Sequence, residues 1–231
     1  MKKTSVDYSI VLPVYNEEET IKEIIKRVRK VPYPGKREII VVDDGSTDNT
    51  SKLLLSIPEI RVITNKVNRG KGYSLRCGFE KAKGKIVLIQ DADLEYDPRD
   101  HLRLIEKLNS DRIDVVYGSR FLEGKHKPRY TLFYFGNIFL SYLTRILFQK
   151  EITDMETGYK AFKRKVLNDL DLSAERFDFE PEITCKLIKK GYTIVEVPIS
   201  YQSRSFAEGK KIGISDGIRA IYVLLKLYFV K

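Results

Sequence analysis

The sequence has 231 residues, and its 42 Lys and Arg against 32 Asp and Glu give a formal net charge of +10. Hydrophobic residues make up 42% of it, with 14 Tyr and 11 Phe, which excludes a largely disordered chain. Cys77 and Cys185, like His101 and His126, lie too far apart in sequence to indicate a zinc cluster or a disulfide framework. Catalysis should therefore rest on carboxylates, Lys, Arg and the backbone, in a reducing compartment.

The termini and the apolar stretches give no sign of export. Residues 1–13 carry two lysines but lack the apolar core of a secretory signal peptide. The most apolar stretch, residues 130–144, holds 15 uncharged residues between Arg129 and Arg145, fewer than the roughly 20 that a membrane-spanning helix needs. We therefore expect no transmembrane helix.

Expected strands and helices alternate along the chain. Residues 8–14 predict a first strand, and Asn16, spaced like a capping box from Glu19, predicts a helix that ends before Pro32. The elements that follow are strands at 39–42, 60–64, 86–89, 113–117 and 193–197, and helices from Thr47, over 72–83, after Pro98 and from Pro181 to before Gly191. The alternation predicts an α/β fold with a mostly parallel central sheet, in a single domain over residues 1–231.

Polar clusters follow three of the predicted strands, at residues 13–17, 43–46 and 90–95. Ligands bind outside the carboxyl ends of the strands in an open parallel sheet, so these clusters are the candidate site. Asp91 and Asp93 are two residues apart and point to the same side if the strand geometry persists. Two such carboxylates suit Mg²⁺ or Mn²⁺, although a helix-capping cluster would share the pattern.

Several spaced motifs resemble one known family. The runs VLPVYNEE, VVDDGSTDNT, NRGKGYSLRCGFEKAKG, QDADLE, YGSRF, DMETGYKAF, FDFEPEIT and EVPISYQSRSFAEGKKI are similar, in this order, to the family 2 glycosyltransferases of the GT-A fold. Within that family they look most like the polyprenyl-phosphate hexose transferases, the dolichol-phosphate mannosyltransferase group and its glucosyl relatives. The resemblance covers nearly the whole chain and implies a Rossmann-like GT-A sheet flanked by helices.

The resemblance also implies a donor site. The residues that it assigns to the nucleotide sugar are Pro13, Tyr15, Glu17, Val42, Asp44, Asp91, Ala92, Asp93, Arg120, Arg204 and Lys210. The metal, Mg²⁺ or Mn²⁺, would be held by Asp91 and Asp93, with Glu95 as a third ligand. For Pro13 and Val42, ordinary strand packing explains the residue equally well.

The expected reaction moves mannose or glucose, with inversion, from GDP-mannose or UDP-glucose to a polyprenyl phosphate. Asp93, Arg120, Arg204 and Asp154 are the candidate catalytic residues. Because the second pKa of a phosphate monoester is about 6, the attacking oxygen is already ionised and needs no base. A sugar hydroxyl acceptor, the alternative, would need one, and Asp154 is the candidate, with Glu156 behind it. Asp154 could instead orient a basic residue or the sugar.

Three acids near a predicted helix start, Asp178, Glu180 and Glu182, are explained by helix electrostatics alone. A basic nucleic-acid-binding protein, which the net charge would suit, is a remote alternative because no such motif occurs, and we expect no nucleic-acid partner.

Two apolar, aromatic segments contain a few basic residues and predict amphipathic helices that lie on a membrane surface: residues 130–148 and 214–230. They fall in the acceptor half, about residues 121–231, and the nucleotide-sugar half is about residues 1–120. We expect a peripheral protein on the cytoplasmic, inner face of the membrane, held by these helices or by a membrane-anchoring partner protein.

Overall fold

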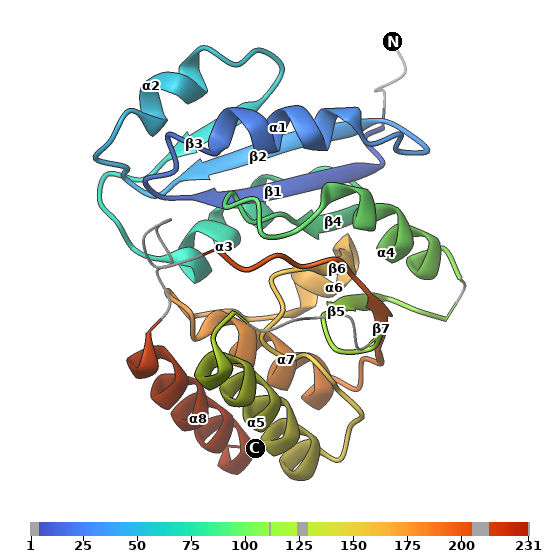
Figure 1. The fold of residues 1–231 in the computed structure, drawn as a ribbon. Coiled ribbons are helices and arrows are strands. Elements are labelled where there is room, and N and C mark those ends of the chain that lie inside the picture. The colour runs from blue at the N-terminus through green and yellow to red at the C-terminus, as the bar shows by residue number, and fades with distance from the viewer. Residues whose placement is uncertain (1–4, 111, 124–128, 205–212, 231) are drawn as a thin grey trace.

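A central sheet organises the computed structural model, which describes residues 5–110, 112–123, 129–204 and 213–230. Within these ranges seven strands pair in the order β3-β2-β1-β4-β6-β5-β7 (Figure 1). Their bounds are β1 (Tyr8–Val14), β2 (Arg37–Asp43), β3 (Arg61–Thr64), β4 (Ile86–Ile89), β5 (Val115–Ser119), β6 (Lys160–Lys163) and β7 (Ile194–Pro198).

The sheet is mostly parallel, as predicted. Strands β1, β2, β3 and β4 pair in parallel, and so do β5 and β7, whereas β6 runs antiparallel to both β4 and β5. The sequence analysis did not predict β6, which is only four residues long and has a lysine at each end. This strand joins the two parallel groups into one sheet.

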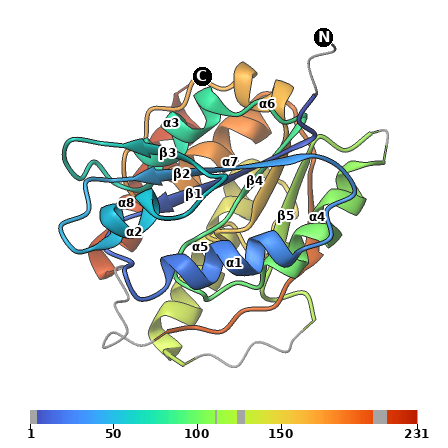
Figure 2. The ribbon, with the colours of Figure 1, turned by 90° about the horizontal axis from the view of Figure 1, so that it is seen from above.

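Helices cover both faces of the sheet (Figure 2). Helices α1 (Ile21–Lys30) and α4 (His101–Leu108) lie on one face, and α3 (Lys71–Lys81), α6 (Arg164–Asp169) and α7 (Phe179–Lys189) lie on the other. A 3₁₀ turn at Pro98–Asp100 precedes α4, and the short α2 (Thr50–Leu55) precedes β3.

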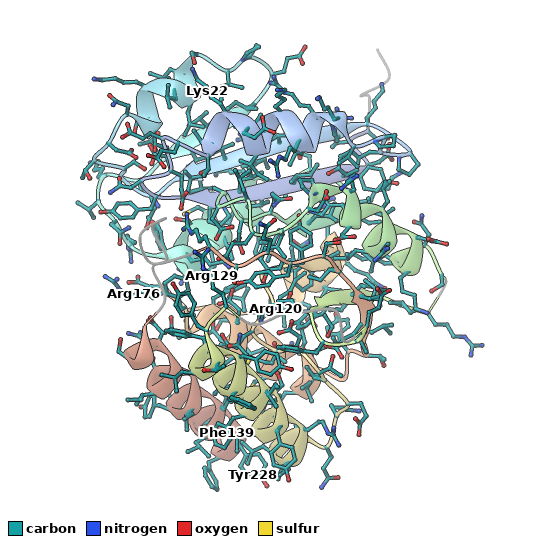
Figure 3. The ribbon with its side chains drawn as sticks, in the orientation of Figure 1. Lys22, Arg120, Arg129, Phe139, Arg176 and Tyr228 are labelled. Atoms are coloured by element: carbon teal, nitrogen blue, oxygen red, sulfur yellow. The ribbon has the colours of Figure 1, made fainter. Side chains whose placement is uncertain are left out.

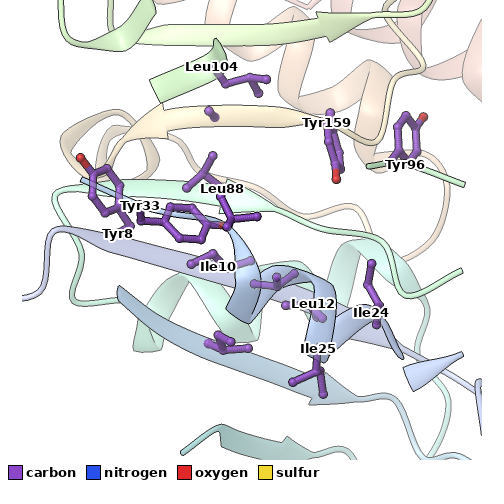
Figure 4. Close-up of a cluster of buried hydrophobic side chains, with 14 of the residues drawn as sticks. Tyr8, Ile10, Leu12, Ile24, Ile25, Tyr33, Leu88, Tyr96, Leu104 and Tyr159 are labelled. Atoms are coloured by element: carbon purple, nitrogen blue, oxygen red, sulfur yellow. The ribbon is translucent and has the colours of Figure 1, made fainter. Parts of the chain in front are cut away.

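Each face of the sheet buries its own core because successive strand residues point to opposite sides. On the α1 face, Ile10 and Leu12 pack with Ile24 and Ile25 in one cluster (Figure 4). Val11 belongs to the cluster on the α3 face. There α3 approaches so closely that a Cβ built on Gly78 would lie 2.3 Å from Val11 Cγ1, so a glycine is required.

The start of the first helix differs from the prediction. Helix α1 begins at Ile21, and Asn16 precedes it with φ +49°. The Asn16 carboxamide accepts a hydrogen bond from the Thr47 backbone N–H at 2.8 Å, so it ties two loops together rather than capping the helix. The polar loops that follow β1 and β2 are thereby held side by side.

Two long helices, α5 (Thr131–Phe148) and α8 (Ile214–Phe229), form a further layer beyond α7 (Figure 1). They share a core cluster in which Leu140 of α5 packs with Ala220 and Leu224 of α8. Their other sides expose large apolar residues: Leu132, Phe135, Ile138, Phe139, Tyr142 and Ile146 on α5, and Ile218, Tyr222, Leu225, Tyr228 and Phe229 on α8. The predicted amphipathic surface helices are present.

Helix α5 is longer than the 15-residue apolar stretch on which the expectation of no transmembrane helix rests. Helix α5 continues through Arg145 to Phe148, and its 18 residues have a mean hydropathy of 1.2. By length and composition alone it qualifies as a span, and no other helix in the described part of the chain does. Only 17% of its residues are buried, so it is not an ordinary core helix.

Candidate active site

A cleft of about 490 Å³ opens at the carboxyl ends of β1, β2 and β4, where the topology of a parallel sheet predicts a ligand site. Ten of the predicted site residues line it: Pro13, Tyr15, Glu17, Asp44, Asp91, Ala92, Asp93, Glu95, Arg120 and Arg204. Phe133 and Asn137 of α5 and Asp216 of α8 also line it. One cavity therefore connects the acidic strand ends to the first turns of the two apolar helices.

Two predicted site residues that the structure describes, Val42 and Asp154, do not line the cleft. Val42 lies in the core on the α3 face and is fully buried, so strand packing explains it. Asp154 is fully buried next to the cleft. Lys210 lies outside the residues that the structure describes.

Asp44 organises the loop between β3 and α3. Its Oδ1 accepts hydrogen bonds from Asn65 Nδ2 and the Arg69 backbone N–H, and its Oδ2 accepts from the backbone N–H groups of Arg69 and Gly70, at 2.6 to 3.1 Å. Gly70 has φ +103°, which favours glycine. A base-binding role for Asp44 remains a prediction, since its oxygens already hold this loop against the end of β2.

Arg204 crosses the cleft to the loop after β1. Its guanidinium binds the Glu17 carboxylate in two parallel hydrogen bonds of 2.9 and 3.1 Å, and lies 3.9 Å from Asp93 Oδ2. Such forks match planar carboxylate and phosphate groups alike. A residue distant in sequence thus closes one side of the acidic pocket.

The acids after β4 lie close enough to interact. The pKa of Asp93 is raised to about 7 by burial and by the negative charges of Asp91 and Glu95. The Lys71 ammonium compensates Asp91 at 2.9 Å. The Glu95 carboxylate, however, accepts hydrogen bonds from the Tyr201 hydroxyl and the Arg204 backbone N–H, both at 2.7 Å.

The donor set fits a hard cation at Asp91 and Asp93, because half-buried neighbouring carboxylates are stabilised in their charged form by a positive ion between them. Among the described residues, no group of three or more His, Cys, Asp or Glu side chains is arranged to hold a metal. Two carboxylates would then need ligands from water and substrate, and Glu95 as third ligand remains a prediction.

Arg120, at the end of β5, is held in place by Asp154. Its Nε and Nη2 each donate to one Asp154 oxygen at 2.7 Å, and its backbone N–H donates to Oδ2 at 3.0 Å. The Glu196 carboxylate accepts from the backbone N–H groups of Thr153 and Asp154, which fixes the loop. Because Asp154 is buried and both its oxygens bind Arg120, it orients a basic residue and cannot reach a substrate as a base.

Sequence reasoning missed five charged residues of the cleft: Lys71, Glu156, Arg176, Glu180 and Asp216. Lys71 bridges Asp91 and Glu180, at 2.9 and 3.0 Å, and its only sequence signal was its place in the run NRGKG. Glu180 lines the cleft, although its place at a helix start had suggested a merely stabilising role. Glu156, considered only behind Asp154, lines the cleft while Asp154 does not.

Solved structures of glucosyl-3-phosphoglycerate synthase from Mycobacterium tuberculosis resemble this fold. One of them, in complex with Mn²⁺, uridine diphosphate and phosphoglyceric acid, superposes with a TM-score of 0.73 over 98% of this chain and 80% of that chain, at 22% sequence identity. This likeness confirms the GT-A type fold that the sequence predicted.

Named relatives match over most of their length. A dolichol-phosphate mannosyltransferase from Pyrococcus furiosus is 32% identical over 94% of this chain and 63% of its own length. A polyprenol monophosphomannose synthase from Mycolicibacterium smegmatis is 31% identical over 88% of this chain and 80% of its own. A UDP-N-acetylglucosamine–dolichyl-phosphate N-acetylglucosaminyltransferase from Methanococcus voltae is 31% identical, with 94% of each chain covered.

Residues 9–171 match the profile of the family described as "Glycosyl transferase family 2". The chain therefore belongs to the family 2 glycosyltransferases.

Proposed function

We propose that this glycosyltransferase moves a hexose, mannose or glucose, from GDP-mannose or UDP-glucose to a polyprenyl phosphate, with inversion. The observation that carries the proposal is that one cleft joins Asp91 and Asp93 to Arg120 and to the first turns of α5 and α8. A nucleotide diphosphate, a phosphate nucleophile and a lipid tail need these three environments in this order. The names of the relatives, which include transferases to polyprenyl and dolichyl phosphates, support the same acceptor class.

At the donor end, Asp91 and Asp93 would hold Mg²⁺ or Mn²⁺, which supplies positive charge to the diphosphate leaving group. Tyr15 and Glu17 line the same pocket, where Glu17 could accept hydrogen bonds from ribose hydroxyls once Arg204 turns to a phosphate. The fork of Arg204 is suited to that exchange of a carboxylate for a phosphate.

At the acceptor end, Arg120 would bind the polyprenyl phosphate. Asp154 fixes the guanidinium plane before substrate arrives, so little reorganisation is needed when two anions are brought together. The phosphate is ionised near neutral pH, so the site needs no base, in agreement with a buried and fully bonded Asp154.

The exposed apolar sides of α5 and α8 would dock the protein on a membrane. Figure 3 shows Phe139 and Tyr228 at the end of the molecule formed by these helices, opposite to Lys22. Phe139 is 51% exposed and Tyr228 is 45% exposed. Aromatic side chains at headgroup depth and basic residues such as Arg145 are typical of helices that lie in a membrane interface. We place the protein at the cytoplasmic, inner face, where the free thiols of Cys77 and Cys185 agree with a reducing compartment.

The function is tested by incubating the protein with radiolabelled GDP-mannose or UDP-glucose, Mn²⁺ and a short polyprenyl phosphate. We expect a charged glycolipid product with one of the donors, and none when the metal is chelated. A product only with sugar hydroxyl acceptors would contradict the acceptor, and the absence of any product with every donor and acceptor would contradict the proposed reaction.

A further inference from the structure

Two carboxylate oxygens in the cleft have no partner. Among the described residues, Glu156 Oε1 and Glu180 Oε2 are buried and accept no hydrogen bond. Both residues line the cleft, and Glu180 is only 4% exposed. A buried polar atom without a partner carries a desolvation cost, which is compensated when a ligand supplies the missing donor.

The neighbouring cations do not supply those donors. The Lys71 ammonium is shared between Asp91 and the other oxygen of Glu180. Lys160, which is also buried, donates to backbone carbonyl oxygens, including that of Met155 at 3.1 Å.

Arg120, a further cation of the cleft, gives its Nε–H and one Nη2–H to Asp154. Among the described residues no side chain donates to Glu156 Oε1 or Glu180 Oε2, so a ligand in the cleft is a source of the missing donors.

The position of the pair along the cleft indicates which part of a substrate it meets. One ammonium bridges Glu180 to Asp91, so Glu180 lies beside the predicted diphosphate end. The loop that carries Glu156 also packs on Asp91, because a Cβ built on Gly158 would lie 2.0 Å from Asp91 Oδ2. The other end of this loop, Asp154, holds Arg120. The two carboxylates therefore lie between the diphosphate end and the predicted acceptor phosphate.

We infer that Glu156 and Glu180 bind hydroxyl groups of the transferred sugar and so select a neutral sugar over a uronate. The inference rests on the proposed function, since the sugar of a bound donor must lie between its diphosphate and the acceptor. Hydroxyl groups donate to carboxyl oxygens, whereas the carboxylate of a uronate would be repelled by the buried Glu180 carboxylate. A second metal ion is the less suitable ligand, because the Lys71 ammonium already lies 3.0 Å from the Glu180 carboxylate.

The test compares Glu156→Gln and Glu180→Gln with the wild type by calorimetric titration in the presence of Mn²⁺. The ligands titrated are the nucleotides GDP and UDP and the nucleotide sugars GDP-mannose and UDP-glucose. We expect each variant to weaken binding of the nucleotide sugar about ten- to a hundredfold, because the amide replaces one of the two acceptor oxygens by a donor that faces the sugar hydroxyl. Binding of the bare nucleotide should be unchanged. In Glu180→Gln the amide oxygen can still accept from Lys71.

The matched control is Glu106→Gln, the same substitution on the exposed side of α4, which should bind every probe as the wild type does. A wild type that binds no nucleotide in the presence of Mn²⁺ would contradict the proposed function itself. A wild type that binds nucleotide, with variants that bind nucleotide sugar equally well, would overturn only the inference. Because two separate variants are used, a folding defect in one leaves the other to decide.

A uronate donor gives a second readout. UDP-glucuronate and GDP-mannuronate should bind the wild type no better than the bare nucleotides, and Glu180→Gln, which removes the buried negative charge, should narrow the difference in affinity between uronate and neutral donors. Equal binding of neutral and uronate donors by the wild type would overturn the inference. A Glu156→Gln variant that loses turnover with unchanged donor affinity would also overturn it, and would assign Glu156 to proton transfer.

Discussion

Helices α1 and α5 both carry an apolar face, but α1 buries it and α5 leaves it exposed. In α1 the apolar residues Ile21, Ile24, Ile25 and Val28 are all buried against the sheet, and the charged residues face outward. In α5 the apolar side is exposed, whereas the buried side includes Ser141 and Thr144 next to Leu140. The polar atoms of that buried side are satisfied, since Thr144 donates to the Leu140 carbonyl and Ser141 accepts from the Met155 backbone N–H.

This contrast shows that an amphipathic pattern gives a helix a preferred face but does not say what covers it. The apolar face of α1 is covered by the fold itself. On α5, Phe135, Phe139 and Tyr142 recur at spacings of four and three residues along the exposed side, as on a helix that meets an apolar surface. The described chain supplies nothing that covers this side, which agrees with the proposed membrane docking.

The largest expected effect comes from breaking the buried ion pair between Asp154 and Arg120 in the C-terminal half. In Asp154→Asn, Arg120 loses its compensating charge while it stays buried. We expect a loss of about 3 to 5 kcal/mol in the free energy of unfolding, as for other broken buried ion pairs. Denaturant unfolding measures it. An unchanged denaturant midpoint would show that the Arg120–Asp154 pair does not stabilise this half. It would also argue against Asp154 as the residue that positions Arg120.

The second effect separates the cleft from the exposed helices. Asp93→Asn removes one of the two carboxylates that fit the metal, so we expect transfer to fall about 100- to 1,000-fold, the usual cost of losing one preorganised charge-stabilising group. Vesicle binding should not change, because α5 and α8 are untouched. Asp171→Asn, at an exposed aspartate, is the matched control. If both variants transferred at the wild-type rate, the acidic pocket would have no role in catalysis.

The third effect tests the two helices directly. Phe135→Ser combined with Phe139→Ser should weaken binding to phosphatidylglycerol vesicles by a factor of about 20 to 300. Full burial of a ring contributes roughly 1.5 to 3 kcal/mol, and only the exposed half or so of each ring remains to be buried on docking. Stability should barely change, since both rings are exposed by more than half. Ile24→Ala in α1 should do the reverse, with about 2 to 5 kcal/mol of stability lost and vesicle binding retained.

Leu55→Ser, at an 84% exposed position of α2, is the control for a lost surface apolar residue. Co-sedimentation with vesicles reports the binding. A wild type that fails to bind vesicles would contradict direct docking, and the anchoring partner protein predicted from the sequence would then be the alternative to test.

The sheet could be predicted largely from the sequence because its strands are short apolar runs between helices with clear start and stop signals. Strands at residues 8–14 and 86–89 were predicted at their observed bounds. Strand β6 could not be predicted, because its Lys160 looks like a surface residue. It is buried because its ammonium finds carbonyl oxygens of the Met155 and Thr157 backbone, a feature of tertiary structure.

The candidate site was predictable to the extent that topology determines it. Acids at the ends of parallel strands must meet at one edge, so Asp44, Asp91 and Asp93 could be grouped from the sequence. The role of Asp154 could not be predicted, because a catalytic base and a positioning residue differ in burial and in their contacts, which the sequence does not show. Glu180 was explained by its helix start until the structure showed it beside Lys71.

The smallest expected effect is a pH dependence of stability that comes from Glu156, in the cleft between the two halves. Burial and the negative charge of Glu180 raise the pKa of Glu156 from 4.5 to about 8, against the opposing charges of Lys160 and Arg120. Between these values the folded protein keeps a proton that the unfolded chain has released. The free energy of unfolding therefore falls as the pH rises, by at most about 1.4 kcal/mol per pH unit from this one group.

Glu156→Gln cannot release that proton, so its stability relative to the wild type should increase steadily from pH 5.5 to pH 7.5. Thermal unfolding at three pH values in this range measures the difference, with Glu106→Gln as the exposed control whose difference stays constant. A stability difference between Glu156→Gln and the wild type that stays constant with pH would mean that Glu156 is ionised in the folded protein throughout. Its free oxygen would then have to be stabilised by water that enters the cleft between the two halves, and the cleft would hold more water than its buried carboxylates indicate.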